Sequence, residues 1–226
     1  MNTKIDMKHV ILLTLALIFA STISVFMLVI RYFYSDHVQF TFLLWNLFLA
    51  WLPFLLAVIV IMFPVKHYVT YFFGGLWLLF FPNAPYIVTD LLHLRPYHSV
   101  PFWYDMILLL SFALTGLGLG LASLGLMQSW ATRRFGRMGG WLFVLVALLC
   151  AGFGVYIGRF LRWNSWDLFS NPLLLWQDLH LTLTTPYLFV KTAVITSALT
   201  AVFTFSYLLF TLLPQLVVIP SAYSGD

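Results

Sequence analysis

The sequence predicts an all-α bundle of about six transmembrane helices, and three observations support this fold class. Hydrophobic residues make up 62% of the 226-residue chain, whereas charged residues make up 8%. The mean hydropathy is +0.98, far above that of an average soluble domain. The apolar residues also gather in runs of about 20 or more, the length that crosses the hydrocarbon core of a bilayer. We therefore expect a single integral membrane domain over residues 1–226.

Six apolar segments meet this length, at about residues 9–32, 40–63, 68–94, 103–129, 138–161 and 186–214. Lys4 and Lys8 precede the first segment in the manner of a signal peptide. The apolar run from Val10 to Ile30 is too long for a typical signal sequence, so we expect it to be retained as the first helix.

Composition excludes several classes of function. The formal net charge of +4 does not indicate a nucleic-acid partner, because the basic residues lie mostly at the ends of apolar segments. Cys150 is the only cysteine, which excludes an intrachain disulfide and a cysteine-cluster metal site. The chain has no glutamate, so the zinc-protease motif H-E-x-x-H is impossible, and the hydrolase motif G-x-S-x-G is also missing.

Lysine and arginine predict the orientation of the chain. Arg133, Arg134 and Arg137 form the clearest cytoplasmic marker, in the connection between the fourth and fifth segments. The overall margin is narrow, because Arg31, Arg95, Arg159, Arg162 and Lys191 fall on the opposite side. We expect a multi-pass protein of the cytoplasmic membrane with both termini in the cytoplasm.

The third segment contains two prolines that should break its helix. A proline inside a helix removes a hydrogen bond and clashes with the preceding turn. Pro82 and Pro85 should therefore interrupt the helix in the outer leaflet, and Asn83 should cap a short second helix. Irregular backbone at this depth survives only when it is buried in protein or lines a wet cavity.

Glycines in the fourth and fifth segments indicate close helix packing. Gly116, Gly120, Gly154 and Gly158 include pairs at Gly-x-x-x-Gly spacing. They are not a nucleotide-binding motif, because the strand–turn–helix context is missing.

The stretch 163–185 is too polar to span a membrane. Its tryptophans and an amphipathic helix from about Pro172 to Leu183 are typical of a membrane interface, so we expect a surface segment that covers the site as a lid.

Most acidic and imidazole side chains should face one compartment, which is the main indication of a functional site. Ionisable groups at membrane depth are costly, so such a cluster predicts function. Asp90, His93 and Asp105 are the candidate catalytic residues. Tyr86, Asp90 and His93 share one helix face at spacings of four and three residues.

One hypothesis is a metal site formed by Asp90, His93 and His98, whose oxygen and nitrogen atoms suit a divalent ion such as zinc. The alternative is an ion-pair network in which Asp90 and Asp105 pair with Arg159 and Arg162, since buried charges are normally paired. Asp-x-x-His alone is a weak signal, and the structural alternative receives the greater weight.

A further hypothesis, compatible with a metal, is anion binding by arginine. Arg159 and Arg162 lie three residues apart on one face, and guanidinium forks suit phosphate or carboxylate. The predicted anion or substrate site has the members Asn83, Tyr86, Arg159, Arg162, Asn164 and Asp167. Alternatively, the two arginines extend to lipid headgroups.

Three segments resemble an uncharacterised family of bacterial multi-pass membrane proteins, a domain-of-unknown-function family. They are residues 44–53, residues 80–94 with Pro-Asn-Ala-Pro-Tyr-x-x-x-Asp-x-x-His, and residues 158–167 with Gly-Arg-x-x-Arg-x-Asn-x-x-Asp. The resemblance implies a bacterial origin and a membrane location, and no activity.

Three functions remain open from the sequence. The first is a membrane hydrolase acting on a lipid or a lipid-linked anionic substrate at the outer leaflet. The second is a transporter or a binding protein for a small anion or other ligand, a class that often uses broken helices. The third is a structural protein whose charged network only holds the bundle together. The oligomeric state cannot be predicted from these patterns.

Overall fold

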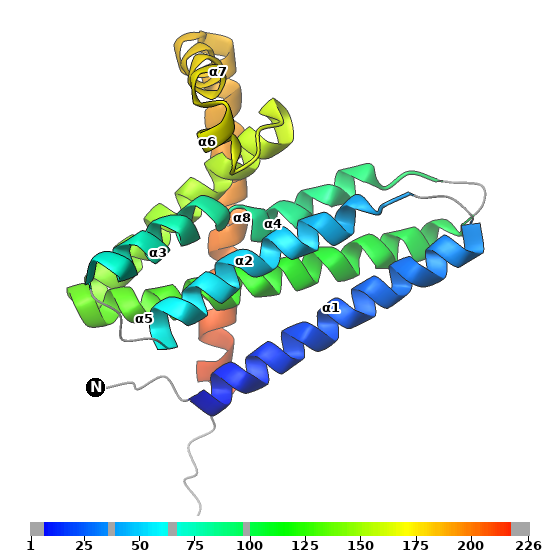
Figure 1. Cartoon of the computed structure of the whole chain (residues 1–226), viewed down its shortest axis with the longest axis horizontal. Coiled ribbons are helices and arrows are strands. Elements are labelled where there is room, and N and C mark those ends of the chain that lie inside the picture. The colour runs from blue at the N-terminus through cyan, green and yellow to red at the C-terminus, as the bar shows by residue number, and fades with distance from the viewer. Residues whose placement is uncertain (1–6, 36–38, 63–66, 97–99, 218–226) are drawn as a thin grey trace, which may run out of the picture.

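The computed structural model describes residues 7–35, 39–62, 67–96 and 100–217, with side chains to residue 213. Every regular element in these ranges is a helix, which confirms the all-α prediction (Figure 1). The elements are α1 (Met7–Ser35), α2 (Phe42–Met62), α3 (His67–Phe80), α4 (Asn83–Tyr86), the 3₁₀ helix η1 (Ile87–His93), α5 (Phe102–Tyr156), the π-helix η2 (Ile157–Leu161), α6 (Asp167–Ser170), α7 (Pro172–Thr184) and α8 (Pro186–Val217).

Five stretches of helix in the described residues are long and apolar enough to cross a membrane. They are Met7–Ser35, Phe42–Met62, His67–His93, Phe102–Leu161 and Pro186–Leu213. The chain is therefore an integral membrane protein. The stretch Phe102–Leu161 has 60 residues, about three times the length that one crossing needs.

This long stretch reverses direction at Gly136, so it contains both the fourth and the fifth predicted segments. Gly136 has φ 76° and ψ 175°, a conformation that is essentially restricted to glycine. The helix otherwise continues through Arg133, Arg134 and Arg137, where the sequence predicts a loop. A single residue without a Cβ is enough for this reversal, so a separate loop is not required.

The third predicted helix is broken where the prolines predict. α3 ends at Phe80, and Phe81 and Pro82 form a turn before α4 and η1. The prediction that Asn83 caps the second helix is wrong, because Pro82 occupies the N-cap and no side chain caps this end. Asn83 instead donates from Nδ2 to the carbonyl of Phe80 at 2.9 Å. Its amide thus stabilises the end of α3.

Both glycine pairs lie against the broken segment. A Cβ at Gly116 would lie 2.9 Å from the carbonyl oxygen of Ala84, and one at Gly120 would lie 3.2 Å from the Ala84 Cβ. On the other arm of α5, a Cβ at Gly154 would lie 2.5 Å from Pro82 Cγ. The close packing that the Gly-x-x-x-Gly spacing predicts is therefore present, and both arms of α5 use it to hold α4.

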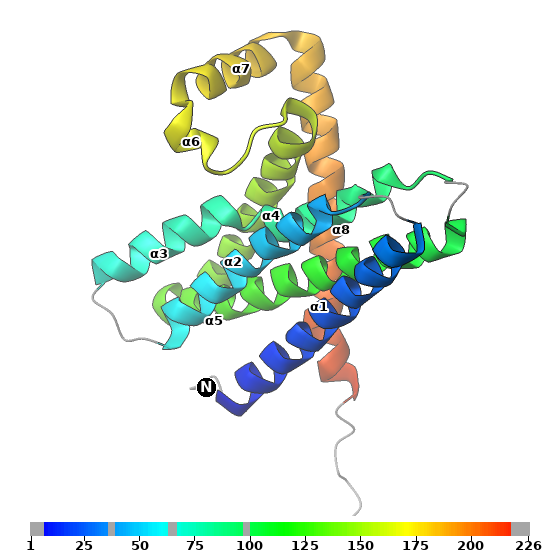
Figure 2. The same cartoon turned by 45° about the vertical axis from the view of Figure 1, so that its right-hand side comes forward.

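Chain segments meet at two opposite ends of the bundle (Figures 1 and 2). One end contains the end of α1, the start of α2, the end of η1 and the start of α5. The other end contains the end of α2, the start of α3 and the reversal at Gly136. α8 crosses α5, and α6 and α7 form an arch beside the end of α5 (Figure 2).

The helix predicted at about Pro172 to Leu183 is present as α7. Its location at a membrane interface stays a prediction.

Candidate functional site

Asp90 is the centre of a buried polar network. Its side chain is 2% exposed, and each of its two oxygens accepts a hydrogen bond. Arg159 Nη2 donates to Oδ1, and Asn46 Nδ2 donates to Oδ2 at 2.8 Å. The guanidinium thus compensates the carboxylate charge inside the membrane-spanning region, as a buried ion requires.

Arg159 is fixed by three kinds of contact. Besides its ion pair, Nε donates to Thr89 Oγ1 at 2.8 Å. The guanidinium also lies 4.3 Å from the centre of the Tyr86 ring, within range of a cation–π interaction. Gly158 allows this arrangement, because a Cβ there would lie 3.1 Å from Tyr86 Cε2.

The backbone that carries Arg159 is irregular. η2 is a π-helix, and Arg162 ends it in the left-handed conformation with φ 63°. π-turns inside α-helices are rare and occur often at functional sites. The backbone N–H of Arg162 donates to the carbonyl of Ile157, whereas its exposed side chain forms no hydrogen bond or ion pair with the described residues. The two arginines of the predicted pair therefore occupy different environments.

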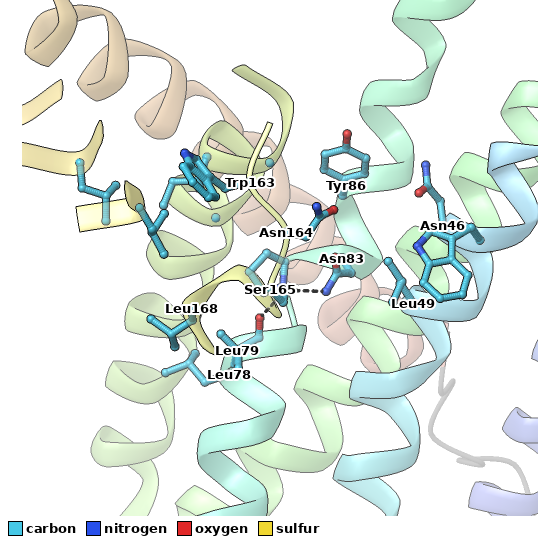
Figure 3. A pocket seen from close by; sticks show the side chains of 17 residues that line it. Asn46, Leu49, Leu78, Leu79, Asn83, Tyr86, Trp163, Asn164, Ser165 and Leu168 are labelled. Carbon is cyan, nitrogen blue, oxygen red and sulfur yellow. Dashed lines mark hydrogen bonds between the residues drawn. The ribbon is translucent and has the colours of Figure 1, made fainter. Parts of the chain in front are cut away.

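A pocket of about 310 Å³ lies beside this network, between α2, the broken third helix, the end of α5 and the α6–α7 arch (Figure 3). Its volume is near the lower limit for small-molecule sites. Leucines form much of its wall, and Asn46, Asn83, Tyr86, Asn164 and Ser165 contribute polar groups. None of the described residues in its lining has a charged side chain. Asp90, His93, Arg159, Arg162 and Asp167 are not among its lining residues.

The loop after η2 is attached to the break in the third helix. Asn83 Nδ2 donates to Ser165 Oγ at 3.1 Å, and that hydroxyl donates to the carbonyl of Leu79 at 3.1 Å (Figure 3). Ser165 thus closes one side of the pocket.

The same loop is bonded internally and to α7. Asp167 accepts from the backbone N–H of Asn164 at 2.7 Å, and from Ser170 Oγ at 3.1 Å. The bond from the Asn164 backbone lowers the pKa of Asp167 below its ordinary value. Trp163 Nε1 donates to Asp178 Oδ2 at 2.8 Å, which ties the loop to α7. Asp167 therefore orders the loop and does not face the pocket.

Asp105 belongs to a different network. It forms a fork with Arg31, through Nε at 2.6 Å and Nη2 at 3.1 Å, and both side chains are 1% exposed. Gln39 Oε1 accepts a further bond from Arg31 at 2.9 Å. The expected pairing of Asp105 with Arg159 or Arg162 is wrong, because Arg31 of α1 binds both carboxylate oxygens of Asp105. Only the pairing of Asp90 with Arg159 is present.

His93 is half exposed at the end of η1. Its Nδ1 lies 3.3 Å from the Asp90 carbonyl oxygen and 3.9 Å from Asp90 Oδ1, and its ring lies 5.0 Å from that of Phe42. His98, the third member of the proposed metal site, lies outside the described residues. Among the residues described, no three His, Cys, Asp or Glu side chains could share a metal ion.

Several partners in these networks were not assigned from the sequence, among them Asn46, Thr89, Ser165 and Arg31. Asn46 carried a usable signal, since it is an isolated amide inside an apolar segment. Thr89 and Ser165 resemble ordinary helix and loop residues, so only the tertiary contacts identify them.

A family model described as "Protein of unknown function (DUF1361)" matches residues 45–213. The chain belongs to this family. The DUF1361 match contains the whole Asp90–Arg159 network and the pocket, and it begins after Arg31. No curated protein matches the chain, and no solved structure matches it.

Proposed function

We propose that the protein binds a lipid-type amphipathic molecule in the pocket beside the broken third helix. The observation that carries this proposal is a pocket whose described lining residues are uncharged and combine several leucines with a group of amide and hydroxyl side chains. Pockets of this mixed character hold an apolar part by contact and orient a polar part by a few hydrogen bonds. A volume of about 310 Å³ accommodates a headgroup or part of a chain, and not a whole lipid.

The polar side chains favour a ligand that both donates and accepts hydrogen bonds. Both N–H bonds of the Asn83 amide are used, by Phe80 and Ser165. The Asn46 amide gives one N–H to Asp90, and the Ser165 hydroxyl gives its hydrogen to Leu79. The amide oxygens of Asn46 and Asn83 are then left to accept, and the second N–H of Asn46 is left to donate. We therefore propose an uncharged headgroup with hydroxyl or amide groups, which both donate and accept.

The same geometry is less favourable to the hydrolase hypothesis. The Asp90 carboxylate is engaged on both oxygens and does not line the pocket. The charge of Arg159 is neutralised by Asp90, and Arg162 does not line the pocket. Neither arginine is therefore placed to bind a phosphate group in the pocket. A binding or transport role uses the pocket without requiring these groups to react.

We also propose that the pocket faces the extracytoplasmic side. Arg133, Arg134 and Arg137 lie at the opposite end of the first arm of α5 from Asp105. The positive-inside rule places that basic end in the cytoplasm.

The test is native mass spectrometry of the protein purified in mild detergent, with tandem dissociation to identify any bound molecule. Leu179 lines the pocket, whereas Leu181 on the same helix is 57% exposed and does not. Leu179→Trp should fill the pocket and remove the adduct. Leu181→Trp is the matched control and should keep it.

Three results would oppose the proposal. Equal adducts in Leu179→Trp and the wild type, or no adduct after membrane extract is added back, would reject the pocket as the site. An adduct with an anionic headgroup that Leu179→Trp removes would reject the uncharged ligand class. A chemically altered ligand would instead favour the hydrolase.

A further inference from the structure

A second cleft lies at the opposite end of the bundle, where α3 begins and α5 approaches its reversal. Its volume is about 170 Å³, and its lining residues are His67, Thr70, Tyr71, Trp130, Arg133 and Arg134. It shares no residue with the pocket beside the broken helix. No role was assigned to this cleft from the motifs of the sequence.

Among the described residues, the charge around this cleft is of one sign. Arg133, Arg134 and Arg137 are exposed on neighbouring positions of α5. The four acidic residues that the structure describes lie elsewhere, in η1, in the first turn of α5, in α6 and in α7. Asp105 begins α5, and Arg133 follows 28 residues later along a helix that rises about 1.5 Å per residue. The acid is therefore about 40 Å away.

Aromatic rings form the apolar side of the cleft. The Tyr71 and Trp130 rings meet edge to face at 6.1 Å, and Trp130 meets Phe135 at 6.0 Å. The Arg134 guanidinium lies 5.8 Å from the centre of the Phe135 ring. Tryptophan and tyrosine are enriched where membrane-spanning helices meet the headgroup layer. The cleft thus combines cationic groups with the residues of a membrane interface.

We propose that this cleft binds the phosphate-bearing headgroup of an anionic membrane lipid. Guanidinium groups donate paired hydrogen bonds to phosphate oxygens, and basic clefts between membrane helices hold anionic headgroups. A volume of about 170 Å³ is roughly that of six water molecules in the liquid. This space accommodates a phosphate and its substituent, and the acyl chains would extend along the helices.

The position of the cleft favours a lipid over free phosphate. His67 is the first residue of a membrane-spanning stretch, and Tyr68 and Phe72 beside it are 69% and 63% exposed. These apolar surfaces would contact the acyl chains of a lipid whose headgroup lies in the cleft. Inorganic phosphate has no apolar part, so these surfaces would not add to its binding free energy.

The test is a titration of the full-length protein in neutral detergent, read as the shift in Tm, with short-chain phosphatidylglycerol, phosphatidylcholine and inorganic phosphate. Phosphatidylglycerol should raise the Tm of the wild type to a plateau, and the other two should not. Arg133→Gln/Arg134→Gln should weaken the apparent affinity about tenfold or more, because each arginine near a charged surface contributes on the order of 1 kcal/mol.

The matched control is Arg95→Gln/Lys191→Gln, which removes the same charge elsewhere and should bind as the wild type does. Arg133→Lys/Arg134→Lys should bind with intermediate affinity, because an ammonium keeps the charge and loses the fork. Equal weakening in the control would show nonspecific attraction and overturn the proposal. An equal Tm shift with inorganic phosphate, or unchanged affinity in the glutamine variant, would also overturn it.

Discussion

Asp90 is a carboxylate inside a membrane-spanning stretch, and residues of two other helices bind its oxygens. Asn46 of α2 and Arg159 of η2 reach it from opposite parts of the sequence. Removing one member of a buried pair leaves the other charge uncompensated, which costs more than the pair contributes in net stability. Asp90 therefore joins three segments of the chain, whatever further role it has.

Asp90→Asn should lower the stability of the protein by about 3 kcal/mol, because the Arg159 cation stays buried without a counter-charge. For a chain of this size that corresponds to a fall in Tm of about 6–12 °C. Thermal unfolding in detergent measures it. Asp90→Asn/Arg159→Gln should recover part of the loss. A Tm within about 1 °C of the wild type would show that the pair contributes nothing.

We expect the stability of the loop after η2 to depend on pH through the Asp167 carboxylate. Hydrogen bonding from the Asn164 backbone lowers the pKa of Asp167 in the folded state. Its stabilisation is therefore present above the unfolded pKa of about 3.9 and is lost as the pH falls through the folded pKa. Hydrogen exchange of residues 163–171, corrected for intrinsic rates, should show protection at neutral pH that falls below about pH 4.

The control for that measurement is Asp167→Asn, which cannot titrate. Its loop should be less protected at neutral pH and should lose little more at low pH. The same acid-dependent loss in Asp167→Asn would assign the effect to another group.

At the scale of elements, α4 is held between the two arms of α5 by glycines. The prolines end the regular helix, and the missing Cβ atoms on α5 leave room for the irregular backbone. Irregular backbone in a membrane protein is tolerated where protein covers it. The proline and glycine patterns of distant segments thus belong to one packing arrangement.

Gly154→Ala should destabilise the protein by about 1–3 kcal/mol, because its Cβ would meet the rigid ring of Pro82. That Cβ would lie 2.5 Å from Pro82 Cγ, whereas a Cβ at Gly75 would meet nothing within 4 Å. Gly75→Ala is the matched helical control and should be neutral or stabilising by up to about 1 kcal/mol. Similar Tm values for the two variants would contradict this packing.

At the scale of the whole molecule, the charged residues are separated between the two ends of the first arm of α5. The buried acids Asp90 and Asp105 lie towards the end where η1 finishes and α5 begins. The arginine cluster Arg133, Arg134 and Arg137 lies at the reversal, at the opposite end. This separation of charge is the basis of the proposed orientation, and it also supports the proposed lipid-binding cleft.

Orientation can be measured with single cysteines in a Cys150→Ala background. Arg134→Cys should react with a membrane-impermeant maleimide in inverted vesicles and not in intact cells. Ser170→Cys, in the exposed α6, should show the reverse. The opposite pattern would invert the proposed orientation and move the pocket to the cytoplasmic side.

Several features could be predicted from the sequence because they depend on local chemistry. Apolar runs of membrane length predicted the helical class, and Pro82 and Pro85 predicted the break. The Gly-x-x-x-Gly spacings predicted close packing. A helix was also predicted where α7 lies. The match to DUF1361 confirmed a domain-of-unknown-function family, and the bacterial origin that the resemblance implied stays a prediction.

The pairing of charges was decided by the tertiary structure. Asp90 and Asp105 look equivalent in the sequence, yet one meets Arg159 and the other meets Arg31 of α1. The pocket likewise depends on Asn46, Asn83 and Ser165, which come from segments far apart in the chain. Local patterns determine which backbone is stable in a bilayer. Which side chains share a site depends on how the helices cross, because ion pairs and pockets form from atoms that only packing brings within a few ångströms.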